Sequence, residues 1–104
     1  MEIIPHLNTG HVEAIKSLCR KHRVKSLHVF GSLLSSRFNE LSDVDFLVSF
    51  EELDFGDYAD AYFGLAEDLE ELLGRKVDLV TEKSLRNPYF IESIESNKKL
   101  LYAA

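Results

Sequence analysis

The stretch that decides the fold runs over residues 29–50 and reads VFGSLLSSRFNELSDVDFLVSF. The stretch begins with the last residues of an apolar run, which is followed by a Gly-Ser pair, Gly31 and Ser32. After ten further residues, two aspartates, Asp43 and Asp45, stand at the head of a second apolar run. A carboxylate is costly to bury unless another group pairs with it. The two aspartates therefore either lie at a harmless strand edge or hold a cation.

The apolar runs within and around this stretch have the composition of β-strands. Residues 24–30 are rich in β-branched and apolar side chains, and residues 44–50 form the second run. Because side chains alternate along a strand, the second run has two different faces. One face carries Asp43, Asp45, Leu47 and Ser49, and the other carries Val44, Phe46, Val48 and Phe50. Asp43 and Asp45 therefore point into a common space, about 7 Å apart along the chain.

A third aspartate repeats the same oddity. Asp78 lies inside the short apolar run KVDLVT of residues 76–81, which has the composition of another strand. If that strand lies beside residues 44–50, three carboxylates converge and raise one another's pKa. Mg²⁺ would make such a cluster favourable, because hard divalent ions bind carboxylate oxygens together with water and substrate phosphates. Taken singly, Asp43 is more simply a turn residue after Ser42.

Gly31 and Ser32 offer a second element of a site. Glycine after a strand lets the backbone approach a ligand closely, and N–H groups at a turn or helix start can hold phosphate. A lone Gly-Ser pair is usually an ordinary turn. The stronger indication is the combination of this pair with Asp-x-Asp at the head of the next strand and an aspartate in a third strand.

Two longer segments have the apolar spacing of helices. The first covers residues 8–22, with Asn8 or Thr9 as its N-terminal cap. The second covers residues 57–73, with Gly74 in position to cap its C-terminus.

The remaining elements complete the predicted fold. Pro88 opens a last short helix over residues 89–95. The tail KKLLYAA either adds an edge segment to the sheet or packs on the helices. The order of elements predicts a single α/β (α+β) domain over residues 1–104, with a small mixed sheet and helices packed against it.

Composition narrows the class of protein. The chain has 104 residues, 45% of them hydrophobic, and a net charge of −6. Direct nucleic-acid binding is not expected, because proteins that grip phosphates need a basic surface; the basic cluster at residues 20–25 is interpreted as a solvated helix end. No apolar run approaches the roughly 20 residues of a membrane span, and the N-terminus MEIIPHLNTG does not resemble a signal peptide. These features predict a cytoplasmic protein without a membrane partner.

Several other side chains have simple packing explanations. Cys19 is the only cysteine, which agrees with a reducing compartment, and it is interpreted as a small buried residue and not as a nucleophile. The acidic residues 67–71 are interpreted as a solvated helix face. Core or helix-packing roles are expected for the aromatic residues Phe30, Phe46, Phe50, Tyr58, Tyr62 and Phe63.

The pattern of Gly-Ser, a spacer, Asp-x-Asp and a distal Asp resembles the motif of the polymerase-beta-like nucleotidyltransferase superfamily. In size the chain resembles the minimal nucleotidyltransferases of prokaryotes. The resemblance implies that Asp43 and Asp45 bind Mg²⁺ and that Asp78 completes a second metal site or helps to deprotonate the acceptor. It also implies that Gly31 and Ser32 hold the β- and γ-phosphates of ATP.

The segment after the Gly-Ser pair departs from this family pattern. Many minimal nucleotidyltransferases carry basic residues there, whereas this chain has Leu33, Leu34, Ser35 and Ser36 before Arg37. Arg37 either supplies the phosphate-binding charge from a shifted position or is an ordinary surface residue. The chain also has no second domain to hold a large acceptor, so an acceptor site borrowed from a partner is expected.

In this family the partner is often a helical protein of the HEPN class, and the pair resembles a toxin–antitoxin system. The resemblance implies an Mg²⁺-dependent enzyme that transfers AMP from ATP to a tyrosine of the HEPN ribonuclease and silences it, in a homo- or hetero-oligomer. Two alternatives stay open. One is a catalytically weak module that neutralises a HEPN partner by complex formation, and the other is transfer to a small-molecule acceptor.

Overall fold

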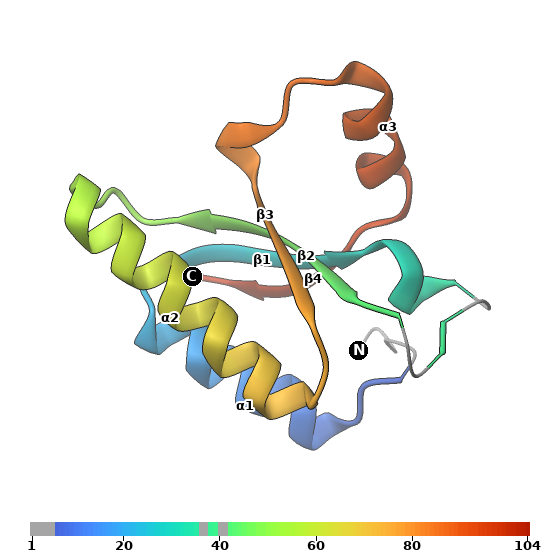
Figure 1. Cartoon of the computed structure of the whole chain (residues 1–104), viewed down its shortest axis with the longest axis horizontal. Coiled ribbons are helices and arrows are strands. Elements are labelled where there is room, and N and C mark those ends of the chain that lie inside the picture. The colour runs from blue at the N-terminus through green and yellow to red at the C-terminus, as the bar shows by residue number, and fades with distance from the viewer. Residues whose placement is uncertain (1–5, 36–37, 40–41) are drawn as a thin grey trace.

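The computed structural model describes residues 6–35, 38–39 and 42–104, which form a four-stranded sheet with helices on both faces (Figure 1). The spatial order of the strands is β3-β2-β1-β4. β2 runs antiparallel to β1 and parallel to β3, while β4 runs antiparallel to β1. The prediction of a small mixed sheet is therefore confirmed. The strand bounds are β1 (Val24–Phe30), β2 (Val44–Phe50), β3 (Val77–Thr81) and β4 (Lys99–Ala103).

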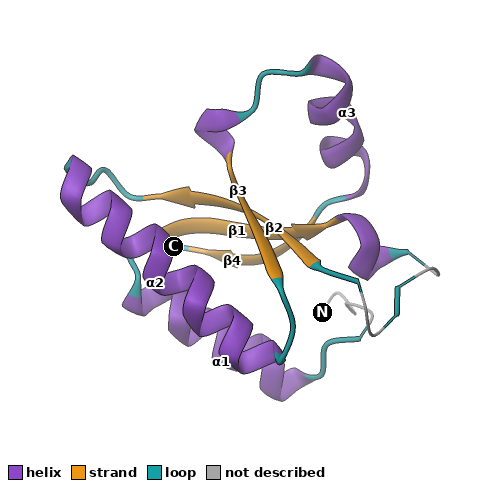
Figure 2. Cartoon of the chain, in the orientation of Figure 1, coloured by secondary structure: helices purple, strands orange, loops and turns teal. Residues whose placement is uncertain are grey.

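The helices begin and end close to the predicted positions (Figure 2). Asn8 caps the first helix, because its side chain accepts a hydrogen bond from the backbone N–H of His11. Gly74 ends the second helix in the left-handed conformation, with a φ of 65°. That helix begins before residue 57, because Asp54 caps it. The bounds are α1 (Thr9–Lys21), α2 (Phe55–Leu73) and α3 (Pro88–Asn97), with short 3₁₀ helices η1 (Gly31–Leu34) and η2 (Glu82–Ser84).

The C-terminal tail takes the first of its two predicted alternatives. It forms β4, which pairs with β1 so that Lys99 lies opposite Val29. Leu101 of this strand is buried in the main core. The tail therefore adds an edge strand to the sheet. Among the described residues, no helix has both the length and the apolar character needed to cross a bilayer.

The two faces of β2 contact different helices, as the alternation predicts. Val44, Phe46, Val48 and Phe50 are buried in the main core with residues of α1 and α2. On the opposite face, Leu47 is buried against Phe30 and against Ile94 of α3. Asp45 shares this second face, because it lies two residues before Leu47. α3 therefore covers the middle of the face to which the aspartates belong.

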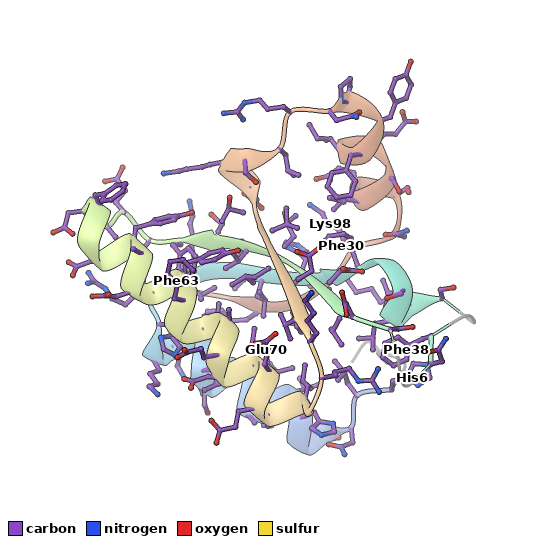
Figure 3. The ribbon with its side chains drawn as sticks, in the orientation of Figure 1. His6, Phe30, Phe38, Phe63, Glu70 and Lys98 are labelled. Carbon is purple, nitrogen blue, oxygen red and sulfur yellow. The ribbon has the colours of Figure 1, made fainter. Side chains whose placement is uncertain are left out.

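Part of the acidic run of α2 is bonded to neighbouring elements. The Asp68 carboxylate lies 2.7 Å from Nε2 of His22 and 3.0 Å from Nζ of Lys21. The hydrogen bond with His22, followed by that with Lys21, lowers the pKa of Asp68. Glu70 accepts a hydrogen bond of 3.0 Å from the backbone N–H of Val77 and so joins α2 to β3 (Figure 3). The solvated-face interpretation is wrong for Asp68 and Glu70, because α2 packs against α1 and β3 along this side.

Two single-residue interpretations have opposite outcomes. Cys19 is buried in the main core, and burial raises the pKa of its thiol to about 12. The interpretation of Cys19 as a small buried residue is confirmed. Phe63 is 65% exposed, so its assignment to the core or to helix packing is wrong. The buried side of α2 is set by Ala61 and Leu65, and a residue midway between them faces outwards in a helix of 3.6 residues per turn.

Gly64 lets α2 approach the end of α1. A Cβ added at Gly64 would lie 2.7 Å from Cε1 of His22. We expect Gly64→Ala to displace His22 from Asp68 and to cost about 1–2 kcal/mol of unfolding free energy relative to a control helix substitution. Urea denaturation measures this difference. Gly56→Ala in the same helix is the control, because its nearest neighbour would lie at 3.9 Å; equal stability of the two variants would contradict the argument.

Candidate active site

The strand register brings the predicted aspartates together. Asp45 in β2 pairs with Asp78 in the parallel strand β3 and with Phe30 at the end of β1. Side chains of paired residues on neighbouring strands lie on the same face of a sheet. Asp43, two residues before Asp45, continues that face. The three aspartates therefore gather at one end of the sheet, where β1 ends and β2 and β3 begin.

Gly31 and Ser32 contact two of these aspartates from the end of β1. Gly31 has a φ of 73°, and a Cβ added there would collide with Oδ2 of Asp45. Glycine tolerates both this backbone conformation and the close approach. The Ser32 N–H donates to Oδ2 of Asp45 at 3.5 Å, and the Ser32 hydroxyl donates to the backbone carbonyl of Asp43 at 2.8 Å. The Gly-Ser pair therefore positions the Asp-x-Asp segment directly.

The three carboxylates differ in burial. Asp45 is half-buried, whereas Asp43 and Asp78 are exposed. Asp78 stands at the end of the sheet, before Val80 packs under α3, so this acid of the run KVDLVT does not occupy a core position. Burial raises the pKa of Asp45, the hydrogen bond from the Ser32 N–H opposes this, and the charges of Asp78 and Asp43 raise the pKa further.

These groups fit a hard divalent cation in chemistry and in charge. Mg²⁺ prefers carboxylate oxygens, and a cation would relieve the repulsion from Asp78 and Asp43, which adds to the effect of burial in raising the pKa of Asp45. The ion pairs identified among the described residues join other side chains. Within the described ranges, however, no three His, Cys, Asp or Glu side chains are close enough to form a ready metal-binding group. The aspartates therefore lie near one another and repel one another, but they do not form a preorganised set of metal ligands.

Arg75 is a contributor that the sequence did not indicate. Its Nη1 atom donates to the carbonyl of Asn39 at 2.9 Å and to that of Ser42 at 3.1 Å. Its guanidinium also lies 4.4 Å from the centroid of the Phe38 ring, and the His6 ring lies tilted against the same phenylalanine at 4.7 Å (Figure 3). Because Ser42 precedes the first aspartate of the site, Arg75 holds the segment that leads into it. These contacts join residues far apart in the chain, so no local sequence pattern predicts them.

The other predicted phosphate-binding residue cannot be compared with this geometry. Arg37 lies outside the residues that the structure describes, so its role stays a prediction. On the α3 side of the sheet, the Phe30 ring packs edge-on against Phe90 of α3, with ring centroids 6.1 Å apart. Lys98 pairs with Glu95 of α3 at 2.8 Å. Of the predicted phosphate-binding residues, the structure therefore describes Gly31 and Ser32.

Comparison with known sequences identifies the family. Residues 12–101 match the model of the nucleotidyltransferase domain. The chain belongs to the nucleotidyltransferase family. This nucleotidyltransferase is 42% identical to the Methanocaldococcus jannaschii protein MJ1379 over 91 residues, which are 80% of this chain and 90% of that protein. It is 39% identical to the protein adenylyltransferase MntA of Thermococcus cleftensis over 87 residues, which are 84% of this chain and 82% of MntA.

A solved complex has the same fold. It contains the tri-AMPylated HEPN toxin of Shewanella oneidensis together with its MNT antitoxin. The matched chain of that complex has a TM-score of 0.61 and 25% identity to this nucleotidyltransferase, over 89% of this chain and 70% of that chain. The family and the fold class predicted from the Gly-Ser and Asp-x-Asp pattern are therefore confirmed.

Proposed function

We propose that this nucleotidyltransferase transfers AMP from ATP to a hydroxyl group of a protein, that the acceptor is a tyrosine of a HEPN-type toxin, and that the chain acts as its antitoxin. The observation that carries the proposal is the pairing of Asp45 with Asp78 beside the Gly31–Ser32 turn. The name of MntA and the AMPylated toxin in the solved complex support it. A protein acceptor also agrees with the exposure of Asp78.

Each residue of the site has a distinct role in this proposal. Asp43 and Asp45 would hold Mg²⁺, with Asp78 completing a second metal site or accepting a proton. Bound Mg²⁺ would neutralise charge on the phosphates and stabilise the attacking and leaving oxygens. The backbone at Gly31 and Ser32 would bind the β- and γ-phosphates of ATP. Arg37 would add positive charge next to them.

The proposed reaction is an in-line displacement at the α-phosphorus. The acceptor hydroxyl oxygen forms a new bond to this phosphorus, and the bond from phosphorus to the α–β bridging oxygen breaks. Pyrophosphate leaves with the electron pair of that bond. The hydroxyl proton passes to the carboxylate of Asp78, whose exposed position lets it release the proton to water.

A second candidate is neutralisation of the HEPN partner by binding alone. The specific observation in its favour is that the described residues contain no three ligands already gathered around one position. In that case the aspartates would not be needed for antitoxin action. The two candidates predict different outcomes for variants that lack the carboxylates.

The test uses ATP labelled at the α-phosphate, Mg²⁺ and the purified product of the neighbouring gene, which the proposal expects to be a HEPN-type protein. We expect label to appear on the HEPN protein with the wild-type chain and not with an Asp43→Ala/Asp45→Ala variant. ATP labelled at the γ-phosphate should leave no label, which distinguishes AMP transfer from phosphorylation. A stable complex without labelling, formed equally by the double variant, would overturn the proposal and establish the binding module.

Arg75 gives a prediction about the loop before Asp43. We expect Arg75→Met to raise the Mg²⁺ concentration needed for half-maximal AMP transfer by about tenfold, because an untethered Asp43 must be ordered when the ion binds. The measurement is a Mg²⁺ titration at saturating ATP. Arg86→Met is the matched control, since Arg86 also donates through Nη1 to two backbone carbonyls but in the loop before α3. An equal shift in both variants would contradict a specific role for Arg75.

A further inference from the structure

We propose that a groove between α2 and β3 is the surface on which the acceptor protein docks, and that it receives an apolar segment carrying positive charge. This inference rests on the proposed function and adds the location and chemistry of its protein-binding surface. The groove has a volume of about 460 Å³. We call it the aromatic groove, and its principal lining residues are Phe55, Tyr58, Tyr62, Phe63, Leu79 and Val80.

Two exposed phenylalanine rings line the aromatic groove. Phe55 is 92% exposed and Phe63 is 65% exposed. Both lie on α2 and line the same groove, and Figure 3 shows Phe63 on that helix. Neighbouring exposed apolar side chains with a polar surround are typical of protein interaction sites. Burying two phenylalanine rings would give a partner the aromatic anchors that dominate the energetics of many interfaces.

The aromatic groove lies on β3, the edge strand that also carries Asp78. Leu79 and Val80, which line it, directly follow Asp78 in the strand. The Tyr62 hydroxyl donates to the carbonyl of Leu79 at 2.7 Å. Burial raises the pKa of Tyr62, and the charge of Asp78 raises it further, which places this wall within the electrostatic range of the carboxylate. A protein held in the groove would therefore contact the same strand as the group proposed to accept its hydroxyl proton.

The charges around the aromatic groove favour a basic protein segment over a nucleotide. The residues that line it carry no charged side chain. Its surroundings are mostly acidic: exposed Asp54 precedes Phe55, exposed Glu67 lies one helical turn beyond Phe63, and Asp78 and Glu82 flank the β3 wall. Lys83, next to Glu82 in the short helix η2, is a basic residue among these acids. A triphosphate needs cations close by, whereas lysine or arginine side chains at the edge of an apolar segment would complement these acids.

The test measures binding and catalysis separately. Binding of the purified HEPN-type protein is measured by isothermal titration calorimetry, ATP binding with a fluorescent ATP analogue, and AMP transfer with the α-labelled nucleotide. We expect Phe55→Ser/Phe63→Ser to weaken protein binding at least tenfold and to leave ATP affinity unchanged. Glu67→Lys/Glu82→Lys should also weaken protein binding and should reduce its dependence on salt. Tyr89→Ser is the matched control, because Tyr89 is 83% exposed on α3, outside the groove.

The other outcomes overturn either the inference or the proposed function. Loss of ATP affinity in the phenylalanine double variant would make the groove a nucleotide site. A change from dimer to monomer in light scattering, with HEPN binding intact, would make it a surface for self-association. Unchanged HEPN binding in both double variants, or equal weakening by Tyr89→Ser, would remove the groove from the interface. Wild-type binding without AMP transfer would overturn the proposed function alone, since the variants would still test where the partner docks.

Discussion

Replacing Asp45 with asparagine is expected to lower the rate of AMP transfer by about 100- to 1,000-fold, the usual effect of removing a group that stabilises charge in a transition state. Asp45 links the other groups of the site, because it pairs with Asp78 and accepts a hydrogen bond from the Ser32 N–H. Asparagine keeps the size and one oxygen of the side chain but removes the negative charge that would hold Mg²⁺. Initial rates with α-labelled ATP measure the loss.

The same substitution is expected to preserve or raise stability at neutral pH. The pKa of Asp45 is raised in the folded protein, chiefly by burial. The folded state therefore binds this proton more tightly than the unfolded state does. The contribution of Asp45 to stability is fully present below the unfolded pKa and is lost as the pH rises through the folded pKa. Asparagine has no proton to lose, so Asp45→Asn should gain stability relative to wild type over that interval.

Thermal denaturation without Mg²⁺, at several pH values from 3 to 7, measures this difference. Glu52→Gln is the control, because Glu52 is exposed and lies outside the site. Together the two results would separate function from folding: a variant that is as stable as wild type and inactive has lost a catalytic group. A variant that is both inactive and less stable at pH 7 would show that the carboxylate is needed to hold Ser32, and the kinetic loss would then have a structural cause.

The parts of the site that the sequence predicts correctly depend on local patterns. Alternation along β2 assigns Asp43 and Asp45 to one face, and this face is confirmed because Leu47 packs against α3 while its neighbours pack against α1 and α2. The Gly-Ser pair is similarly local, since it directly follows β1. Strand periodicity fixes such features without any knowledge of the tertiary fold.

The parts that the sequence does not predict depend on contacts between distant segments. The pairing of Asp45 with Asp78 requires the crossover through α2. From the sequence alone, the carboxylates could be expected to converge only if these two strands were neighbours, and nothing in the sequence established that they are. Arg75 holds the loop before Asp43 through backbone carbonyls, which have no sequence signature. Phe63 is different, because its exposure follows from its position midway between the buried residues Ala61 and Leu65 in the helix, and helical periodicity alone could have indicated it.

Adding one methyl group at Gly31 is expected to disable the site. Gly31 has a φ of 73°, which costs about 1–2 kcal/mol for a residue with a Cβ. The new Cβ would also collide with Oδ2 of Asp45 and stand 3.2 Å from its Cγ. We therefore expect Gly31→Ala to displace the Asp45 carboxylate and to lower AMP transfer by about 100-fold, because small misplacements of reacting groups cost rates of that order.

Gly74→Ala separates the two effects, because it carries the same backbone strain without the collision. Gly74 has a φ of 65° at the end of α2, and an added Cβ there would meet no atom within 4 Å. Both variants should lose about 1–2 kcal/mol of unfolding free energy from the left-handed backbone, whereas only Gly31→Ala should lose activity and additional stability. If Gly74→Ala lost as much activity as Gly31→Ala, general destabilisation would explain the result. Activity retained in Gly31→Ala would mean that the position of Asp45 next to the Gly-Ser turn is not needed for transfer, and the catalytic role of that turn would have to be abandoned.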